Sequence, residues 1–188
     1  KKSNKNRGRS TNREAARQFG NVRPSKKLGQ NFLIDEDVIA AIVEGSDIDE
    51  DCLVIEIGPG TGVLTCPMAE CAGRLIAVEL DERMIEPLRV KTFGYGNVEV
   101  IHGDILEVDL DAIIAENKEQ YGLKTVRIVG NLPYYITTPI IMKLLEMGTP
   151  ADSITAMMQK EVGVRIAAEP GTKNSGVITY SVHYYAAV

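Results

Sequence analysis

Residues 53–62 read LVIEIGPGTG, an apolar run that passes directly into a turn with three glycines. The run at 53–57 predicts a short strand, and residues 63–72 predict a helix in which Pro67 marks a kink or a first turn. The turn at 58–62 therefore joins a strand to a helix, where glycine lets the backbone approach a ligand closely. Its spacing is GxGxG, which differs from the GxGxxG of dinucleotide-binding proteins.

The alternation of strand and helix continues on both sides of this turn. Further strands are predicted at 75–78, 98–101, 126–129, 154–158 and 177–185. Further helices are predicted at 35–44, 81–89, 138–147 and 160–168. This alternation predicts an α/β fold, with a mostly parallel sheet covered by helices on both faces. Ligands bind such sheets beyond the carboxyl ends of the strands, so the residues directly after each strand are the candidates for function.

Acidic residues follow the second and third strands of this series. Glu79 comes directly after the second strand, where a carboxylate can accept both hydrogen bonds of a ribose diol. Asp104 follows the third strand and can accept a hydrogen bond from the exocyclic amine of adenine, while Ile105 covers the ring. For Glu79 alone, the competing interpretation is a solvated charge at the end of a strand. For Gly103-Asp104, it is a residue pair that is common in turns. Their position in one series with the glycines favours a binding site.

The fourth strand is followed by Asn131-Leu132-Pro133-Tyr134. An exocyclic amine is hard to methylate because its lone pair is delocalised into the ring. A side-chain amide oxygen and a backbone carbonyl that both accept from the NH2 group favour the pyramidal nitrogen that attack requires. Proline stiffens such a turn and restricts the preceding residue, which fixes that carbonyl. Tyr134 can stack on the base, so the tetrad predicts a site for methylation of adenine.

The net charge of −5 is distributed unevenly along the chain. Residues 1–27, the basic arm, hold ten Lys or Arg and one acid and carry +9, whereas the remaining 161 residues carry −14. Such an arm either binds a polyanion or is a solubilising tail, and the charge alone does not distinguish the two. Within it, residues 1–10 are predicted to be disordered, and a T-x-x-E capping box opens a short helix at 11–20.

Several classes of protein are excluded by simpler features of the sequence. No apolar run approaches the length of a membrane helix, and the N-terminus lacks the apolar region of a secretory signal. Cys52, Cys66 and Cys71 match no metal-site spacing and are predicted to be reduced structural thiols. His102 and His183 have no partner spacing and are predicted to be packing or surface residues. We expect no metal, because the methyl donor is already activated and catalysis depends mainly on its alignment with the acceptor.

Seven motifs together resemble the KsgA-type ribosomal RNA adenine dimethyltransferase family, in the family's order and over nearly all of residues 25–188. They are KLGQNFL (27–33), EIGPGTG (56–62), VELD (78–81), GDIL (103–106), NLPYYITTP (131–139), QKEV (159–162) and PGTKNSG (170–176). The resemblance implies a Rossmann-like methyltransferase fold that uses S-adenosylmethionine. The cofactor-binding residues that it implies are Asn31, Leu33, Gly58, Glu79, Asp104 and Asn131, and we expect Gly60 and Ile105 to bind the cofactor with them. The catalytic residues that it implies are Asn131, Leu132 and Tyr134.

The resemblance also implies a substrate and partners. The family dimethylates, at N6, two adjacent adenosines near the 3′ end of small-subunit ribosomal RNA. We therefore expect small-subunit ribosomal RNA within an immature subunit as partner, a cytoplasmic location, a monomer and no membrane contact. Related Erm-type enzymes act on large-subunit ribosomal RNA, but GPGTG and NLPYYITTP are closer to the KsgA branch. Two more hypotheses are methylation of adenine in DNA, which uses similar (D/N)PPY tetrads, and a non-catalytic role in ribosome assembly.

The chain departs from the family's pattern in two places. Ser175 stands where the family usually has an aromatic residue, which affects a local RNA contact. The chain stops at Val188, whereas the family continues into a loop with a base-sandwiching aromatic residue and then a small helical RNA-binding domain. We expect residues 1–24 to be a basic, partly disordered N-terminal extension and residues 25–188 to be the catalytic domain. We expect the helical domain to be absent from this chain, which impairs activity.

Overall fold

The structure is a computed structural model of the chain, and it describes residue 25, residue 30 and the ranges 32–146 and 148–188. The disordered segment expected at 1–10, the helix expected at 11–20 and the expected cofactor residue Asn31 lie outside these described residues.

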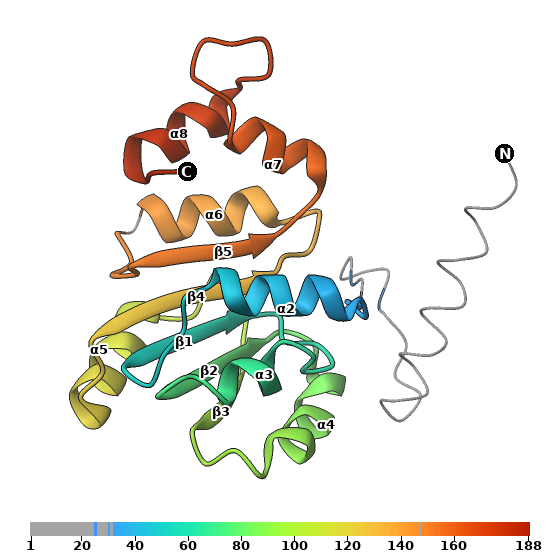
Figure 1. Cartoon of the computed structure of the whole chain (residues 1–188), viewed down its shortest axis with the longest axis vertical. Coiled ribbons are helices and arrows are strands. Elements are labelled where there is room, and N and C mark those ends of the chain that lie inside the picture. Colours follow the sequence, from blue (N-terminus) through green and yellow to red (C-terminus); the bar gives the residue numbers. More distant parts are fainter. Residues whose placement is uncertain (1–24, 26–29, 31, 147) are drawn as a thin grey trace, which may run out of the picture.

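The described residues contain one sheet of five parallel strands, in the order β3-β2-β1-β4-β5 (Figure 1). The strands are β1 (Cys52–Ile57), β2 (Arg74–Glu79), β3 (Val98–His102), β4 (Thr125–Asn131) and β5 (Ser153–Met157). Parallel strands need long crossovers, and helices supply most of them here. The prediction of an α/β fold is confirmed.

Helices cover both faces of the sheet, because β1 directs apolar side chains alternately to either side. Leu53, Ile55 and Ile57 belong to one core cluster, together with residues of α5 (Leu110–Tyr121) and α6 (Thr137–Glu146). Val54 belongs to a second cluster, which includes residues of α3 (Thr65–Ala69) and α4 (Glu82–Thr92) and the apolar side of α2 (Glu36–Gly45). Every residue of β1 is buried, as expected for a central strand with two covered faces.

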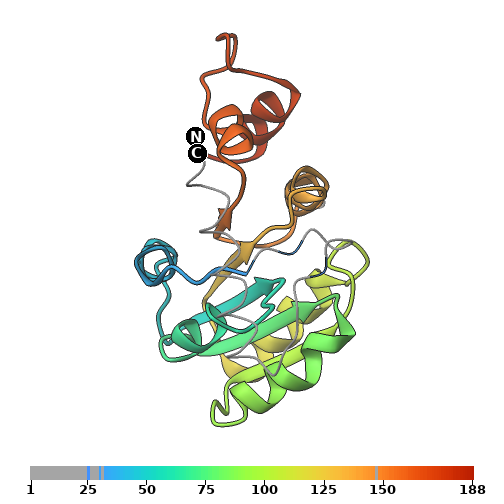
Figure 2. The ribbon, with the colours of Figure 1, turned by 90° about the vertical axis from the view of Figure 1, so that its right-hand side faces the viewer.

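Two further helices extend the fold beyond α6. The helices α7 (Lys160–Ile166) and α8 (Val177–Tyr185) contact one another, and α8 contacts α6. Figure 2 shows α7 and α8 as a separate layer that stands beyond the β5 edge of the sheet. This layer lies above α6 in Figure 1, on the side of the sheet where the chain ends.

The strand predicted at 177–185 is wrong, because this segment forms α8. Its β-branched and aromatic composition favours a strand, but its most deeply buried side chains, Thr179 and Val182, are spaced three residues apart. That spacing places both on one side of a helix, against α6 and α7. The helix α5 was not predicted from the sequence, because its apolar side is short and is interrupted by polar residues. The other elements predicted within the described residues are present, and Pro67 lies in the first turn of α3.

The strand order creates a switch in direction next to β1. The chain runs outward from β1 to β2 and β3, and then returns to the other side of β1 with β4. A crevice forms at the carboxyl ends of two such strands, which is where α/β sheets bind ligands. Ile57 is paired with Gly130, and a Cβ at Gly130 would lie only 2.9 Å from the Ile57 carbonyl oxygen. The glycine turn at 58–62 and Asn131 therefore leave the sheet side by side.

Candidate active site

The turn at 58–62 depends on glycine. Gly58, Gly60 and Gly62 have φ angles of 67°, 53° and 70°, in the left-handed region that other residues avoid. The N–H of Gly58 donates to the Val78 carbonyl at 3.0 Å, and the N–H of Gly60 donates to the carboxylate of Glu79 at 2.9 Å. The turn that follows β1 is thus held against the end of β2.

Glu79 is buried at the end of β2, with 4% of its surface exposed. Its second carboxylate oxygen accepts from the backbone N–H of Asp81 at 2.8 Å. Burial raises the pKa of Glu79, and the two backbone donors oppose that rise. Each oxygen retains a lone pair after these bonds, so the carboxylate can still accept hydrogen bonds from a diol.

Asp81 connects this strand end to the segment before α2. Its carboxylate accepts from Arg83, whose guanidinium lies at 2.6 Å and 2.8 Å, and from the side-chain amide of Gln30 at 3.0 Å. The hydrogen bond with Arg83 holds the pKa of Asp81 below its usual value. Gln30 also exchanges hydrogen bonds with Ser25, at 2.8 Å and 3.1 Å. These contacts place the segment that contains Leu33 over the glycine turn.

The loop after β3 carries Asp104 and Ile105. One carboxylate oxygen of Asp104 accepts from the N–H of Leu106 at 2.9 Å, which fixes the side chain at the start of the loop. Ile105 is buried, and its carbonyl accepts from the ammonium of Lys143 on α6 at 2.8 Å. Lys143 also donates to the Val108 carbonyl at 2.9 Å, so α6 holds both ends of the loop.

The Asn131–Tyr134 turn leaves β4 in a defined conformation. The Leu132 N–H donates to the Met157 carbonyl at 3.0 Å, and the Leu132 side chain is buried. The Pro133 carbonyl accepts from the N–H of Ile136 and from the hydroxyl of Thr137 at 2.9 Å. The Leu132 carbonyl accepts no hydrogen bond from any described residue. The side chain of Tyr134 is about half exposed, at 48%.

These strand ends surround one cleft with about 940 Å³ of atom-free space, part of it open to solvent. Most of the expected site residues line this cleft: Leu33, Gly58, Gly60, Glu79, Asp104, Ile105, Asn131, Leu132 and Tyr134. The residues come from four strand ends and from the segment before α2, and the fold brings them together. Asn31 lies outside the described residues.

The sequence profile of a family described as "Ribosomal RNA adenine dimethylase" matches residues 21–188. The chain belongs to this family. It is 50% identical over 161 residues to the Ribosomal RNA small subunit methyltransferase A of Alkaliphilus metalliredigens, which covers 86% of this chain and 55% of the relative. The chain therefore spans about half the length of the curated relatives that it matches.

Solved structures of similar proteins agree with the dimethylase family. A dimethyladenosine transferase from Plasmodium falciparum is 28% identical with a TM-score of 0.69, over 81% of this chain and 52% of that chain. The 23S rRNA methyltransferase ErmE is 32% identical with a TM-score of 0.61, over 72% of this chain and 50% of that chain. The fold is thus the Rossmann-like fold of S-adenosylmethionine-dependent methyltransferases.

Several residues that line the cleft were not singled out from the sequence. They are Phe32, Pro59, Leu80, Tyr135, Ile136 and Ile140. A Cβ at Gly60 would lie 3.8 Å from the Phe32 ring, so this ring covers the glycine turn. The doubled tyrosine in NLPYY and the aromatic residue in QNFL were visible signals. Their place in the cleft depends on loop conformation, which periodicity does not predict.

Glu56, on β1 directly before the glycine turn, is the most deeply buried acid near the cleft. Its side chain is 1% exposed, and neither its Oε2 nor the Thr65 hydroxyl has a hydrogen-bond partner of normal geometry. Burial raises the pKa of Glu56 to about 8, a rise that the nearby Thr65 hydroxyl and Lys91 oppose and the charge of Glu79 increases. A pKa of about 8 favours the protonated form of Glu56 at neutral pH.

The described part of the chain contains no disulfide and no cluster of metal-ligating side chains. The thiols of Cys52, Cys66 and Cys71 are free, and burial raises the pKa of Cys52 and Cys66. Among the described residues no cluster of three His, Cys, Asp or Glu side chains is suited to a metal ion. No helix in the same residues combines the length and the apolar character needed to cross a bilayer.

Proposed function

We propose that this chain carries the catalytic site of an S-adenosylmethionine-dependent methyltransferase that modifies N6 of adenosines in ribosomal RNA. One observation carries the proposal: the Asn131–Tyr134 turn and the Glu79-anchored glycine turn open onto the same cleft. A site that binds a methyl donor and a site that grips an amine must share a cleft if the methyl group is to pass between them. Family membership supports the same reaction.

The cleft fits S-adenosylmethionine in its donors and in its shape. A Cβ built on Gly58 meets nothing within 4 Å, so the backbone there faces open space that a ligand can approach. Glu79 would hold the ribose hydroxyls, Asp104 the adenine amine, and Ile105 the face of the adenine ring. Leu33, Gly60 and Asn131 would complete the site, together with Asn31, which lies outside the described residues.

The chemical step that we propose uses the turn after β4. The bound cofactor supplies a methyl group on a positively charged sulfur, which needs no further activation. The Asn131 side-chain oxygen and the Leu132 carbonyl would accept hydrogen bonds from the target NH2 group, which keeps the lone pair of N6 available for attack. Attack of N6 on the methyl carbon would break the bond from that carbon to sulfur, and the amine would release one proton to the solvent that reaches the open cleft. Tyr134 would stack on the adenine after it leaves its helix.

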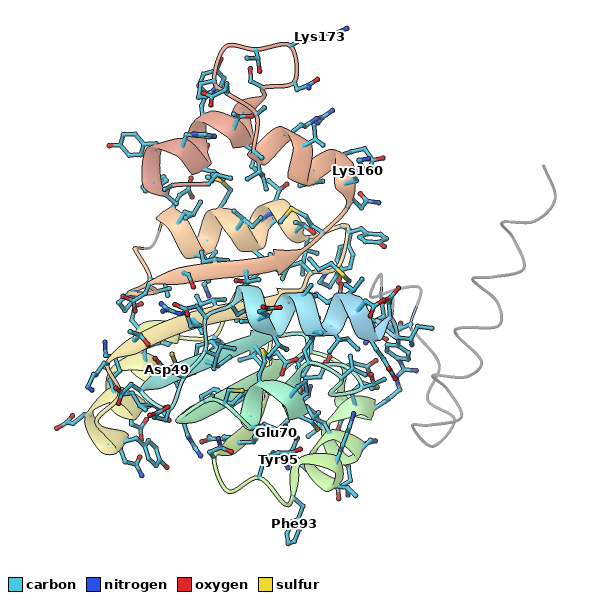
Figure 3. All side chains as sticks on the ribbon, viewed as in Figure 1. Asp49, Glu70, Phe93, Tyr95, Lys160 and Lys173 are labelled. Carbon is cyan, nitrogen blue, oxygen red and sulfur yellow. The ribbon has the colours of Figure 1, made fainter. Side chains whose placement is uncertain are left out.

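The substrate that we propose is small-subunit ribosomal RNA, with two adjacent adenosines near its 3′ end dimethylated during ribosome biogenesis. The 50% identity to a relative named for the small subunit favours it over large-subunit RNA, since ErmE is 32% identical. Residues 25–188 would form the catalytic domain, and residues 1–24 would form a basic extension that contacts RNA. Figure 3 shows Lys160 and Lys173 on the α7–α8 side, where exposed cations extend the surface available to RNA. We propose a cytoplasmic monomer that acts on the immature subunit.

Transfer of tritiated methyl groups from S-adenosylmethionine tests this proposal directly. The full-length protein is incubated separately with undermethylated small subunits, with large-subunit RNA and with DNA. We expect label in the small subunits, at N6 of adenosine after nuclease digestion. Labelling of large-subunit RNA alone would favour an Erm-type enzyme. Cofactor binding without labelling of any of the three substrates would favour an assembly factor.

A further inference from the structure

Lys91, on α4, contacts the glycine turn from behind. Its ammonium donates to the carbonyl of Thr61 at 2.9 Å and to the carbonyl of Gly62 at 3.0 Å. The aliphatic part of the same side chain packs on the turn, since a Cβ at Gly62 would lie 3.4 Å from Cδ of Lys91. Partial burial lowers the pKa of Lys91, and the nearby Cys66 and Glu56 oppose that change.

The glycine turn is thus held by a negative side chain at one backbone N–H group and by a positive side chain at two backbone carbonyl groups. The carboxylate of Glu79 accepts from the N–H of Gly60, and the ammonium of Lys91 donates to the carbonyls of Thr61 and Gly62. Hydrogen bonds to charged groups are stronger than those between neutral groups. Three glycines in five residues leave the turn with few side chains of its own, so these bonds set its conformation.

Lys91 itself does not line the cleft, whereas Gly60 and Thr61 do. Any effect of Lys91 on a ligand must therefore pass through the turn. The Glu79 side of the turn belongs to the ribose site already described. The hydrogen bonds of Lys91 to the turn are not part of that ribose site, and none of the seven family motifs includes Lys91.

We infer that Lys91 is a positioning residue for the cofactor, which holds the carbonyls of the glycine turn so that its backbone keeps the ligand-binding conformation. This inference rests on the proposed function, because it takes the ligand of the turn to be S-adenosylmethionine. Lys91 acts before the ligand arrives, by selecting one conformation of the empty turn. Its loss lowers cofactor affinity and leaves the methyl-transfer step nearly unchanged once the site is saturated.

The test compares Lys91→Met with Lys91→Arg and with two matched controls in the full-length protein. Methionine keeps the length and apolar contacts of lysine but lacks the donor, whereas arginine keeps a charged donor. Lys118→Met removes another bond from a lysine to a carbonyl, the one to Lys124 at 2.9 Å, far from the cleft. Tyr95→Phe removes the hydrogen bond to Glu70 at 3.2 Å, which also links the α3 and α4 regions but does not touch the turn (Figure 3).

Two measurements are made on each variant. Calorimetric titration gives the Kd for S-adenosylhomocysteine, and hydrogen exchange of the ligand-free protein reports on the amides at 60–66. We expect Lys91→Met to raise the Kd roughly tenfold and to speed exchange in the turn, while both controls stay within about twofold of the unaltered protein. Lys91→Arg restores most of the affinity. In steady-state assays KM for the cofactor rises and kcat changes less.

The outcomes separate this inference from the proposed function. If the unaltered protein does not bind S-adenosylhomocysteine, the proposed function fails. If the unaltered protein binds and Lys91→Met binds equally well with unchanged exchange, the role of Lys91 is refuted and the proposed function stands. If Lys91→Met does not fold, Lys91→Arg decides, because a folded arginine variant whose Kd is roughly tenfold or more above that of the unaltered protein refutes the role of a charged donor.

Discussion

Two buried carboxyl groups flank the glycine turn and differ in their hydrogen bonding. Glu79 accepts from two backbone N–H groups, whereas Oε2 of Glu56 accepts no hydrogen bond of normal geometry from the described residues. Buried charge is stable only where donors or opposite charges compensate it. Glu79 is therefore suited to hold a polar ligand as a carboxylate, and Glu56, with its pKa raised to about 8, to remain a neutral part of the core.

At Glu79, substitution by alanine is expected to weaken cofactor binding at least ~10-fold, because charged hydrogen bonds contribute about 1.5–3 kcal/mol each. The Gly60 N–H also loses its acceptor, which loosens the turn. Calorimetric titration with S-adenosylmethionine measures the effect, and thermal unfolding checks that the variant is folded. The exposed neighbour Glu82→Ala is the control. An unchanged Kd in a folded Glu79→Ala protein would refute the ribose assignment.

At Glu56, substitution by glutamine is expected to change how stability depends on pH. A carboxyl group with a higher pKa in the folded chain holds its proton more tightly when folded. Its contribution to the free energy of unfolding therefore declines as the pH rises from about 4.5 to about 8. The free energy of unfolding of Glu56→Gln lacks this decline and rises by up to a few kcal/mol relative to the unaltered protein. Each unit by which folding raises a pKa corresponds to about 1.4 kcal/mol.

Urea unfolding at pH 5 and at pH 8 measures this gain, with the exposed Glu119→Gln as control. We expect the difference between Glu56→Gln and the unaltered protein to grow between the two pH values. A difference that is constant with pH would show that Glu56 is ionised in the folded chain.

Most of the expected site follows from residue type and strand position. Glu79, Asp104 and Asn131 could be predicted because parallel strands end at one edge, which requires no knowledge of packing. Phe32 and the state of Glu56 could not be predicted. The first depends on the path of a loop, and the second on which helices cover one face of β1. Both are properties of tertiary structure that a local pattern does not contain.

At the scale of elements, the five strands of the sheet follow the periodicity of the sequence, and α8 does not. Val177 and the tyrosines of this segment favour a strand by composition, yet helix packing against α6 and α7 decides its structure. A strand would place Val182 and Tyr184 on one face together. The helix separates them, with Val182 5% exposed and Tyr184 82% exposed.

This separation predicts that two substitutions in α8 change the free energy of unfolding by different amounts. Val182→Ala is expected to destabilise the chain by about 1–3 kcal/mol, because it leaves a cavity between α8 and α6. Tyr184→Ala is expected to change the free energy of unfolding by less than about 0.5 kcal/mol, because the ring faces solvent. Chemical denaturation of both variants measures the difference. Equal losses would indicate that the two side chains share a buried face.

At the scale of the whole molecule, charge is separated along the chain. The basic arm at 1–27 carries +9 and the remainder carries −14. An acidic body repels a polyanion at long range, so RNA must be met by local clusters of cations. The arm is the densest of these in the sequence, and we propose that it contributes affinity for RNA and none for the cofactor.

Deletion of residues 1–20 is expected to flatten the plot of log affinity for RNA against log salt concentration. Each phosphate contact that is lost removes counterion release, and the slope falls by about 0.7–0.9 for each contact. Affinity for S-adenosylmethionine should be unchanged in the same protein. Filter binding to undermethylated small subunits over a range of salt gives the slope, and an identical slope with and without the arm would make it a solvated tail.

The molecule as a whole places the proposed methyl-donor site and the proposed acceptor site at one switch in strand order. The pairing of Ile57 with Gly130 makes this possible, because it brings the end of β1 and the end of β4 together. We propose that Asn131 acts on the target nitrogen at this junction. Its hydrogen bonds would be strongest in the transition state, so its loss would lower turnover more than binding.

Single-turnover methylation of undermethylated small subunits by full-length Asn131→Ala tests this claim most directly. We expect the variant to bind RNA and to lose nearly all methyl transfer at saturating cofactor, while Tyr134→Ala retains partial transfer with weaker binding of the base. An Asn131→Ala protein that binds cofactor and RNA and transfers methyl groups at the unaltered rate would contradict the mechanism.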